Sequence, residues 1–92
     1  MERVNKVQLY YFSAEWCMPC KNYGPIVERV CQQTGTELVK IDISTEEGEQ
    51  LATAEGVRGV PTVILSKDGY WQDTRQGVMS ESGLRAFIDG AM

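Results

Sequence analysis

The 92-residue sequence contains no histidine and only three cysteines. Without histidine, Ser–His and Cys–His catalysis and mixed Cys/His zinc sites are excluded. Three cysteines are too few for the scaffold of a disulfide-rich miniprotein. Their odd number instead indicates one functional pair and one remaining thiol.

Positive charge and long apolar runs are also scarce. Nine Lys and Arg residues stand against thirteen Asp and Glu residues, giving a formal net charge of −4. This balance argues against binding to nucleic acids, which requires clustered basic residues. No apolar run is long enough for a membrane span. The N-terminus lacks the apolar segment of a secretory signal, so a cytoplasmic protein is expected, with a mature exported protein as the alternative.

Length and composition predict a single domain over residues 1–92. The hydrophobic fraction of 42% is sufficient for one continuous core, and the charged fraction of 24% is typical of a globular chain. No repeat, low-complexity tract or linker interrupts the sequence. We expect a monomer with neither a metal nor an organic cofactor.

The hydrophobic pattern predicts the element order β-α-β-α-β-β-α. Strands are expected over residues 7–12, 37–43, 62–65 and 70–76, and helices over residues 19–34, 46–55 and 81–91. The first two strands are joined through a helix and should be parallel, whereas Asp68-Gly69 should join the last two as an antiparallel hairpin. The fold class is therefore α/β, with a four-stranded mixed sheet and helices on both faces.

Cys17 and Cys20 lie where the first strand has ended and the first long helix begins. Unpaired amides and the positive end of the helix dipole favour a thiolate there. Cys17, nearer the exposed end, would attack a substrate disulfide as the nucleophile. Cys20 would then resolve the mixed disulfide and leave a Cys17–Cys20 disulfide. The pair predicts a thiol–disulfide oxidoreductase.

Two other interpretations of the cysteines remain open. Cys17 and Cys20 could be core residues or half of a zinc site, but zinc normally requires four ligands and only Cys31 is left, so such a site would need a bridged dimer. Cys31 follows Cys20 by eleven residues on the apolar side of the helix, close to three turns. A buried core thiol is expected at this position, with a regulatory or dimer-forming thiol as the alternative.

The segment Trp16-Cys17-Met18-Pro19-Cys20-Lys21 resembles the W-C-G-P-C-K active site of the thioredoxin family. The resemblance extends in order along residues 4–90. Pro25 resembles the proline inside the active-site helix, Val57-Arg58-Gly59-Val60-Pro61-Thr62 the cis-proline segment, Lys67-Asp68-Gly69 the hairpin turn, and Gly77 the glycine before the last helix. It implies a thioredoxin-like fold in a short version, without the usual first strand and helix.

The resemblance also implies roles for residues around the cysteines. Pro61 would be cis and lie against the pair, the alternative being an ordinary proline at a strand start. The Val60 backbone would then face an extended substrate segment. The implied contact surface comprises Trp16, Met18, Pro19, Ile43, Gly59, Val60, Pro61, Gly77 and Val78.

The sequence departs from the family at the position of its buried Asp, where Tyr11 stands. That Asp is thought to accept the proton of the second thiol, whereas a neutral phenol is a poor base at pH 7. Lys40 matches the lysine that pairs with the Asp. We therefore expect Cys20 to lose its proton through water, or to Lys40 if burial neutralises that amine.

The resemblance implies protein disulfides as substrates, with ribonucleotide reductase or a peroxiredoxin as acceptors and a flavin-dependent thioredoxin reductase as donor. Three alternatives remain: a glutaredoxin-like reductase coupled to glutathione, a non-catalytic binding module with a thioredoxin fold, and an exported oxidant or isomerase.

Overall fold

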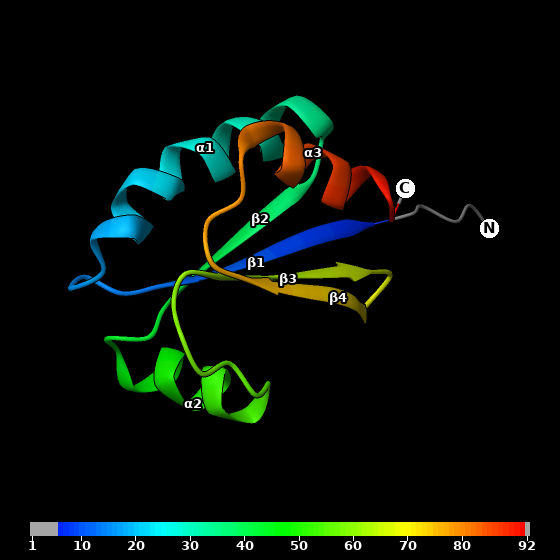
Figure 1. Cartoon of the computed structure of the whole chain (residues 1–92). Helices are drawn as coiled ribbons and strands as arrows, with labels where there is room; N and C mark the ends of the chain where they lie inside the picture. The colour runs from blue at the N-terminus through cyan, green and yellow to red at the C-terminus, as the bar shows by residue number, and fades with distance from the viewer. Residues whose placement is uncertain (1–5, 92) are drawn as a thin grey trace.

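The computed structural model describes residues 6–91 and confirms the predicted element order (Figure 1). The strands are β1 (Val7–Ser13), β2 (Glu37–Asp42), β3 (Thr62–Lys67) and β4 (Tyr70–Gln76), and the helices are α1 (Met18–Thr34), α2 (Glu46–Ala54) and α3 (Glu81–Asp89). Three predicted elements were too long: β2 ends before Ile43, α2 ends before Glu55, and α3 ends before Ala91. Within residues 6–91, no helix has both the length and the apolar character to cross a bilayer.

The sheet has the order β2-β1-β3-β4, so the predicted four-stranded mixed sheet is confirmed. β1 is parallel to β2 and antiparallel to β3, and β4 is antiparallel to β3. In the β1–β2 register, Tyr11 lies opposite Lys40 and Ser13 lies opposite Asp42. β2 is therefore an edge strand whose end lies beside the start of α1.

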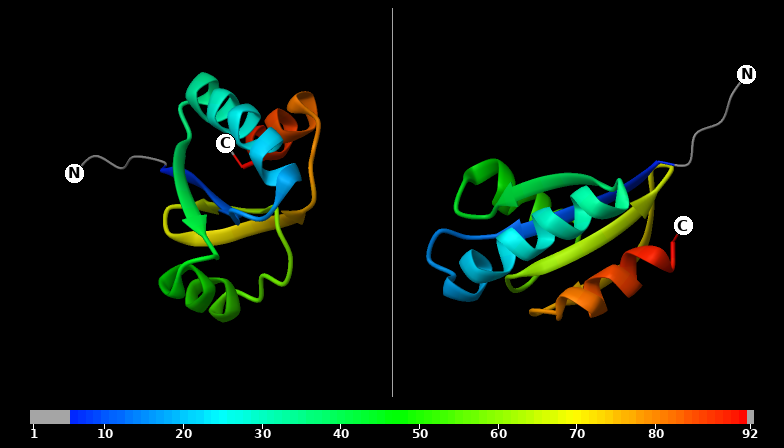
Figure 2. Two further views of the ribbon diagram at one scale, coloured as in Figure 1. Left: turned by 90° about the vertical axis from the view of Figure 1, so that its left-hand side faces the viewer. Right: turned by 90° about the horizontal axis from the view of Figure 1, so that it is seen from above.

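Helices cover both faces of the sheet, with α1 and α3 on one face and α2 on the other (Figure 2). Successive side chains along each strand point to opposite faces of the sheet, so the hydrophobic core consists of two clusters, one on each face. Leu9 and Val63 pack with Val27 on the α1 side, whereas Phe12 and Ile64 belong to the cluster on the α2 side. Burying each such side chain contributes about 1.5–3 kcal/mol, so both faces anchor the central strand β1.

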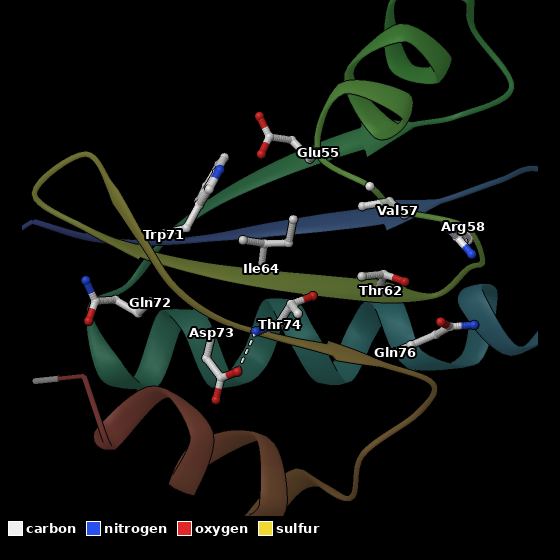
Figure 3. A pocket seen from close by; sticks show the side chains of 11 residues that line it. Glu55, Val57, Arg58, Thr62, Ile64, Trp71, Gln72, Asp73, Thr74 and Gln76 are labelled. Atoms are coloured by element: carbon white, nitrogen blue, oxygen red, sulfur yellow. Dashed lines mark hydrogen bonds between the residues drawn. The ribbon is translucent and has the colours of Figure 1, made fainter.

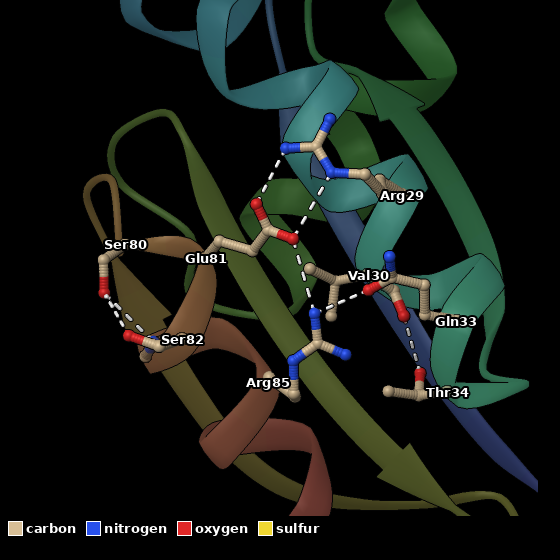
Figure 4. A network of polar contacts seen from close by, with 9 residues as sticks. Arg29, Val30, Gln33, Thr34, Ser80, Glu81, Ser82 and Arg85 are labelled. Carbon is tan, nitrogen blue, oxygen red and sulfur yellow. Dashed lines mark hydrogen bonds and ion pairs between the residues drawn. The ribbon is translucent and has the colours of Figure 1, made fainter.

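A polar network joins α1 to α3 at the surface (Figure 4). Arg29 donates to both carboxylate oxygens of Glu81, at 2.8 and 3.3 Å. Arg85 donates to Glu81 at 3.3 Å and to Gln33 at 2.5 Å. The hydrogen bonds from Arg29 lower the pKa of Glu81. Because these groups are exposed, the network sets the helix pairing more than it stabilises the fold.

The hairpin between β3 and β4 has a two-residue turn. Asp68 and Gly69 have positive φ angles of 53° and 89°. A type I′ turn needs positive φ at both positions, and Asp-Gly tolerates it. A bulge lies just after the turn in β4, where Gln72 has no partner because the pairing register shifts between Leu65 and Ser66. β4 is exposed along its whole length and forms the second edge of the sheet.

Side-chain oxygens cap α2 and α3 at their starts. Thr45 Oγ1 accepts a hydrogen bond from Gly48 N at 3.0 Å, and Ser80 Oγ accepts one from Gly83 N at 3.0 Å. Each bond satisfies an amide that has no partner within its own helix.

We expect Ser80→Ala to lower the free energy of unfolding by about 1 kcal/mol, because the Gly83 amide loses its partner. Ser82→Ala is the matched control, since Ser82 lies in the same turn but caps no amide, and its effect should stay within about 0.5 kcal/mol. Urea denaturation followed by circular dichroism measures both values. Equal effects of the two substitutions would contradict the assigned cap.

Candidate active site

Cys17 occupies the N-cap position of α1, immediately before Met18. The chain leaves β1 at Ser13 and turns back through a hydrogen bond from Cys17 N to Ala14 O, 3.1 Å long. Pro19 follows in the first helical turn, where a residue without an amide proton leaves no bond unmade. This sequence of strand end, turn and proline places the first cysteine at the positive end of the helix.

The Cys17 sulfur itself acts as the capping acceptor. Cys20 N–H donates to Cys17 Sγ, with an N–S distance of 3.2 Å. Caps are usually made by Ser, Thr, Asp or Asn oxygens, so the Cys17 sulfur here takes the position of that capping oxygen. A hydrogen bond to the charged form of an acid stabilises that form. The geometry therefore favours a Cys17 thiolate when the pair is reduced.

Cys17 and Cys20 form a disulfide, with their Cα atoms 5.2 Å apart. This separation lies within the ordinary range for a disulfide, so the pair can open and close without moving the backbone. Ala14 forms a buried cluster with both cysteines, and Ile43 and Val60 pack against it. Both cysteines are largely buried, with Cys17 at the N-cap and Cys20 one turn deeper in the helix, as expected.

Exposed apolar side chains flank the pair. Trp16 is 71% exposed and Met18 is 64% exposed, and Val78 also projects into solvent. Isolated exposed apolar residues are common, but Trp16 and Met18 adjoin Cys17 in the chain and so border the buried disulfide. We define the contact surface as Trp16 and Met18 together with the partly buried Ile43 and Val60, which pack against the cysteine cluster.

The segments around Pro61 and Gly77 meet beside the pair. Gly77 N donates to Pro61 O at 2.8 Å, and Thr62 Oγ1 donates to Gly59 O at 2.6 Å. Gly77 has a φ angle of 95°, which a residue with a side chain rarely adopts. The Val60–Pro61 peptide bond is cis. These bonds bring the two predicted contact segments to one end of the sheet.

Tyr11 lies directly beneath the start of α1. Its hydroxyl donates to the carbonyl oxygen of Cys20 at 2.6 Å, inside the protein. Burial, with smaller contributions from Tyr23 and Glu28, raises the pKa of Tyr11 to about 12. A phenol that keeps its proton at neutral pH and already donates it cannot act as the base for Cys20.

Lys40 does not meet the condition for acting as a base. Its side chain is 57% exposed and its amine forms an ion pair with Glu28. Burial, the condition under which Lys40 was a candidate base, is therefore not met, because β2 is an edge strand and more than half of this side chain faces solvent. Lys40 does line a cavity beside Cys20.

Asp42 is the side chain near the pair that sequence reasoning missed. No motif in the sequence marks it, yet it lines the same cavity as Cys20 and Lys40. Alternation along β2 placed Lys40 and Asp42 on one face. The register between β1 and β2 brings this face of β2 beside Cys20, and that register could not be predicted from the sequence.

Cys31 is a free thiol in the core, 3% exposed, as expected for a buried residue of α1. Burial raises its pKa to about 11. Thiolates are the reactive form, so this cysteine is inert in the folded protein.

A larger cavity, of about 500 Å³, lies on the other side of the sheet (Figure 3). It is bounded by the α2–β3 connection, including Glu55 and Arg58, and by Ile64 and Trp71 of the hairpin. Tyr10 packs edge-on against Trp71, with ring centroids 5.0 Å apart. Neither cysteine of the pair lines this cavity. Within residues 6–91, no group of three or more side chains is arranged to hold a metal ion.

The fold and the reversible pair define a dithiol–disulfide oxidoreductase. The thioredoxin family model matches residues 1–90. A thioredoxin from Pseudomonas aeruginosa is 38% identical over 76 residues, which cover 83% of this chain and 70% of that protein.

Solved structures agree with the family match. A mutant thioredoxin from Halobacterium salinarum superimposes with a TM-score of 0.87 at 40% identity, covering 95% of this chain and 75% of that one. A further structure has a TM-score of 0.82 at 28% identity and covers 94% of this chain and 79% of that one. It concerns thiol resolution in a yeast mitochondrial 1-Cys peroxiredoxin through glutathione and thioredoxin systems. The chain belongs to the thioredoxin family and is a protein-disulfide oxidoreductase with the Cys17–Cys20 pair.

We expect Tyr11→Phe to destabilise the protein by about 1 kcal/mol through loss of the hydrogen bond to Cys20 O. Tyr10→Phe is the matched control on the same strand, since its hydroxyl makes no hydrogen bond within the described residues. Thermal unfolding of both variants gives the comparison. A Tyr10→Phe effect as large as that of Tyr11→Phe would refute the structural role of this bond.

In the reduced protein, iodoacetamide at pH 8 should label Cys17 and leave Cys31 unmodified, because only Cys17 combines a helix-capping position with access at the contact surface. Peptide mass spectrometry after a timed quench identifies the labelled sites. Unfolding in guanidinium should expose Cys31 to the same reagent. Rapid labelling of Cys31 in the folded state would contradict its burial.

Proposed function

We propose that this protein carries electrons to disulfides of partner proteins, with Cys17 as the nucleophile and Cys20 as the resolving thiol. The observation that carries this proposal is the capping of α1 by the Cys17 sulfur, between the exposed apolar side chains of Trp16 and Met18. A site for a small substrate would be enclosed, whereas this one is a surface patch fitted to another protein.

The proposed substrate is an extended segment of a partner protein that carries the target disulfide. Trp16, Met18 and Val78 would contact its apolar side chains. The backbone of Val60 is available to pair with the backbone of the substrate segment, since neither the amide nor the carbonyl of Val60 has a hydrogen-bond partner among residues 6–91. Extended peptides commonly bind by such main-chain pairing.

The proposed donor is a flavin-dependent thioredoxin reductase, and the proposed acceptors are peroxiredoxins or ribonucleotide reductase. The peroxiredoxin choice is supported by the structural neighbour concerned with thiol resolution in a 1-Cys peroxiredoxin. We further propose that residues 1–92 act as a single domain and a monomer in the cytoplasm. The redox-active disulfide would be the only redox group required.

Insulin reduction coupled to NADPH and a thioredoxin reductase tests the function. The native protein should reduce insulin, and Cys17→Ser should abolish turnover because the nucleophile is lost. Cys20→Ser should accumulate a covalent mixed disulfide visible on a non-reducing gel. Cys31→Ala is the control and should retain activity.

Two outcomes would overturn the proposal. Reduction driven by glutathione without a reductase would indicate a glutaredoxin-like enzyme. Full biological activity of Cys17→Ser would indicate a binding module.

A further inference from the structure

A cavity of about 280 Å³ opens beside the resolving cysteine, on the α1 side of the sheet edge. It is lined by Ser13, Ala14, Glu15, Cys20, Lys21, Lys40, Ile41 and Asp42. A water molecule occupies about 30 Å³ of liquid and needs two or more polar partners. The cavity satisfies both requirements, so water can reach the vicinity of Cys20 here.

The charged and titratable groups around this cavity come from every neighbouring element. The strands contribute Tyr11, Lys40 and Asp42, the turn after β1 contributes Glu15, and α1 contributes Lys21 and, through its ion pair with Lys40, Glu28. The acidic residues in the first turn of α2, Glu46, Glu47 and Glu49, belong to the helix on the opposite face of the sheet and do not line the cavity.

Two carboxylates line the cavity, and carboxylates are common general bases. A lysine ammonium group has three donors and no acceptor. The Tyr11 hydroxyl donates to Cys20 O and keeps its proton up to a pKa of about 12. The carboxylates of Glu15 and Asp42 therefore remain.

Asp42 is fixed in place, whereas Glu15 is not. Asp42 Oδ1 accepts a hydrogen bond from Ser44 N at 2.8 Å, and its backbone carbonyl accepts two from Thr45, at 3.1 and 2.8 Å. Asp42 is half-buried at the end of β2, opposite Ser13. Glu15 is exposed, and only its backbone amide is held, by Ser44 Oγ at 3.1 Å.

We propose that the Asp42 carboxylate accepts the proton of Cys20, through water in this cavity, during resolution of the mixed disulfide. The proposal deepens the proposed function and rests on it for the identity of the substrate. Among residues 6–91 no Asp or Glu is buried beneath α1, so the proposal assigns the role of proton acceptor to the end of β2.

The Cys17 thiolate attacks the substrate disulfide, forms the Cys17–substrate bond and releases one substrate thiolate. Cys20 gives its proton to water and Asp42 as its sulfur attacks Cys17 Sγ. The Cys17–substrate bond breaks, the Cys17–Cys20 bond forms, and the second substrate thiolate leaves and can recover the proton from Asp42. The substrate disulfide gains two electrons and the protein pair loses two.

Stopped-flow reaction of the reduced protein with one equivalent of 5,5′-dithiobis(2-nitrobenzoate) separates the two steps. The first release of nitrothiobenzoate reports attack by Cys17, and the second reports resolution by Cys20. Asp42→Asn keeps an oxygen for Ser44 N and removes the base. We expect it to slow the second phase about tenfold or more at pH 7, since general bases typically contribute at least that much. The first phase should change less than about twofold.

The pH profile separates a proton-transfer role from a structural one. The second-phase rate of Asp42→Asn should approach that of the native protein towards alkaline pH, where Cys20 loses its proton to hydroxide and needs no carboxylate. Glu15→Gln is the matched control from the same cavity and should leave both phases unchanged. If Asp42→Asn does not fold, Asp42→Glu and Asp42→Gln form a second pair, of which only the Gln variant should slow resolution.

Three results would overturn the proposal: an unchanged second phase in Asp42→Asn, an equal deficit in Glu15→Gln, or a loss in both phases that is independent of pH. Failure of the native protein to reduce insulin with a reductase would instead refute the proposed function. The two-phase assay would still report on Asp42, because it requires no physiological partner.

Discussion

The hydrogen bond from the Cys20 amide to the Cys17 sulfur is the interaction on which the site depends. It needs a helix that begins at residue 18, a strand that ends at residue 13, and a turn that carries the chain back between them. The two clusters on either face of the sheet hold β1, and β1 holds the start of α1 through Tyr11. The reactivity of Cys17 therefore depends on the whole fold, because the fold holds the Cys20 amide against the Cys17 sulfur.

Replacing an acid with Tyr11 changes the electrostatics beneath the pair. A buried carboxylate would repel the thiolates and accept their protons, whereas a neutral phenol does neither. It donates to a backbone carbonyl instead and ties helix to strand. Stabilisation of the thiolate at Cys17 and removal of the proton from Cys20 are then separated in space: the first comes from the helix end and the second from the solvent-facing edge of β2.

The fold was predictable because its signals are local. Alternation along the strands, the Asp68-Gly69 turn and the helical spacing of apolar residues each act within a few residues, and together they leave few topologies. The cysteine pair was equally clear from its place between a strand and a helix. The hydrogen bond of Tyr11 and the ion pair of Lys40 could not be predicted from the sequence, because they depend on the register between β1 and β2 and on how far a long side chain extends. Asp42 was missed for the same reason, since strand pairing is a non-local property.

The bulge in the hairpin has a consequence for the behaviour of the protein in concentrated solution. β4 is an exposed edge, and a flat exposed edge is a template for the growth of a sheet from one molecule to the next. The shift at Leu65 and Ser66 breaks the regular spacing of backbone donors and acceptors, and the ion pair between Asp73 and Arg75 adds charge along the same strand. A protein that must expose apolar side chains around its active site thus keeps its sheet edge unsuited to self-association.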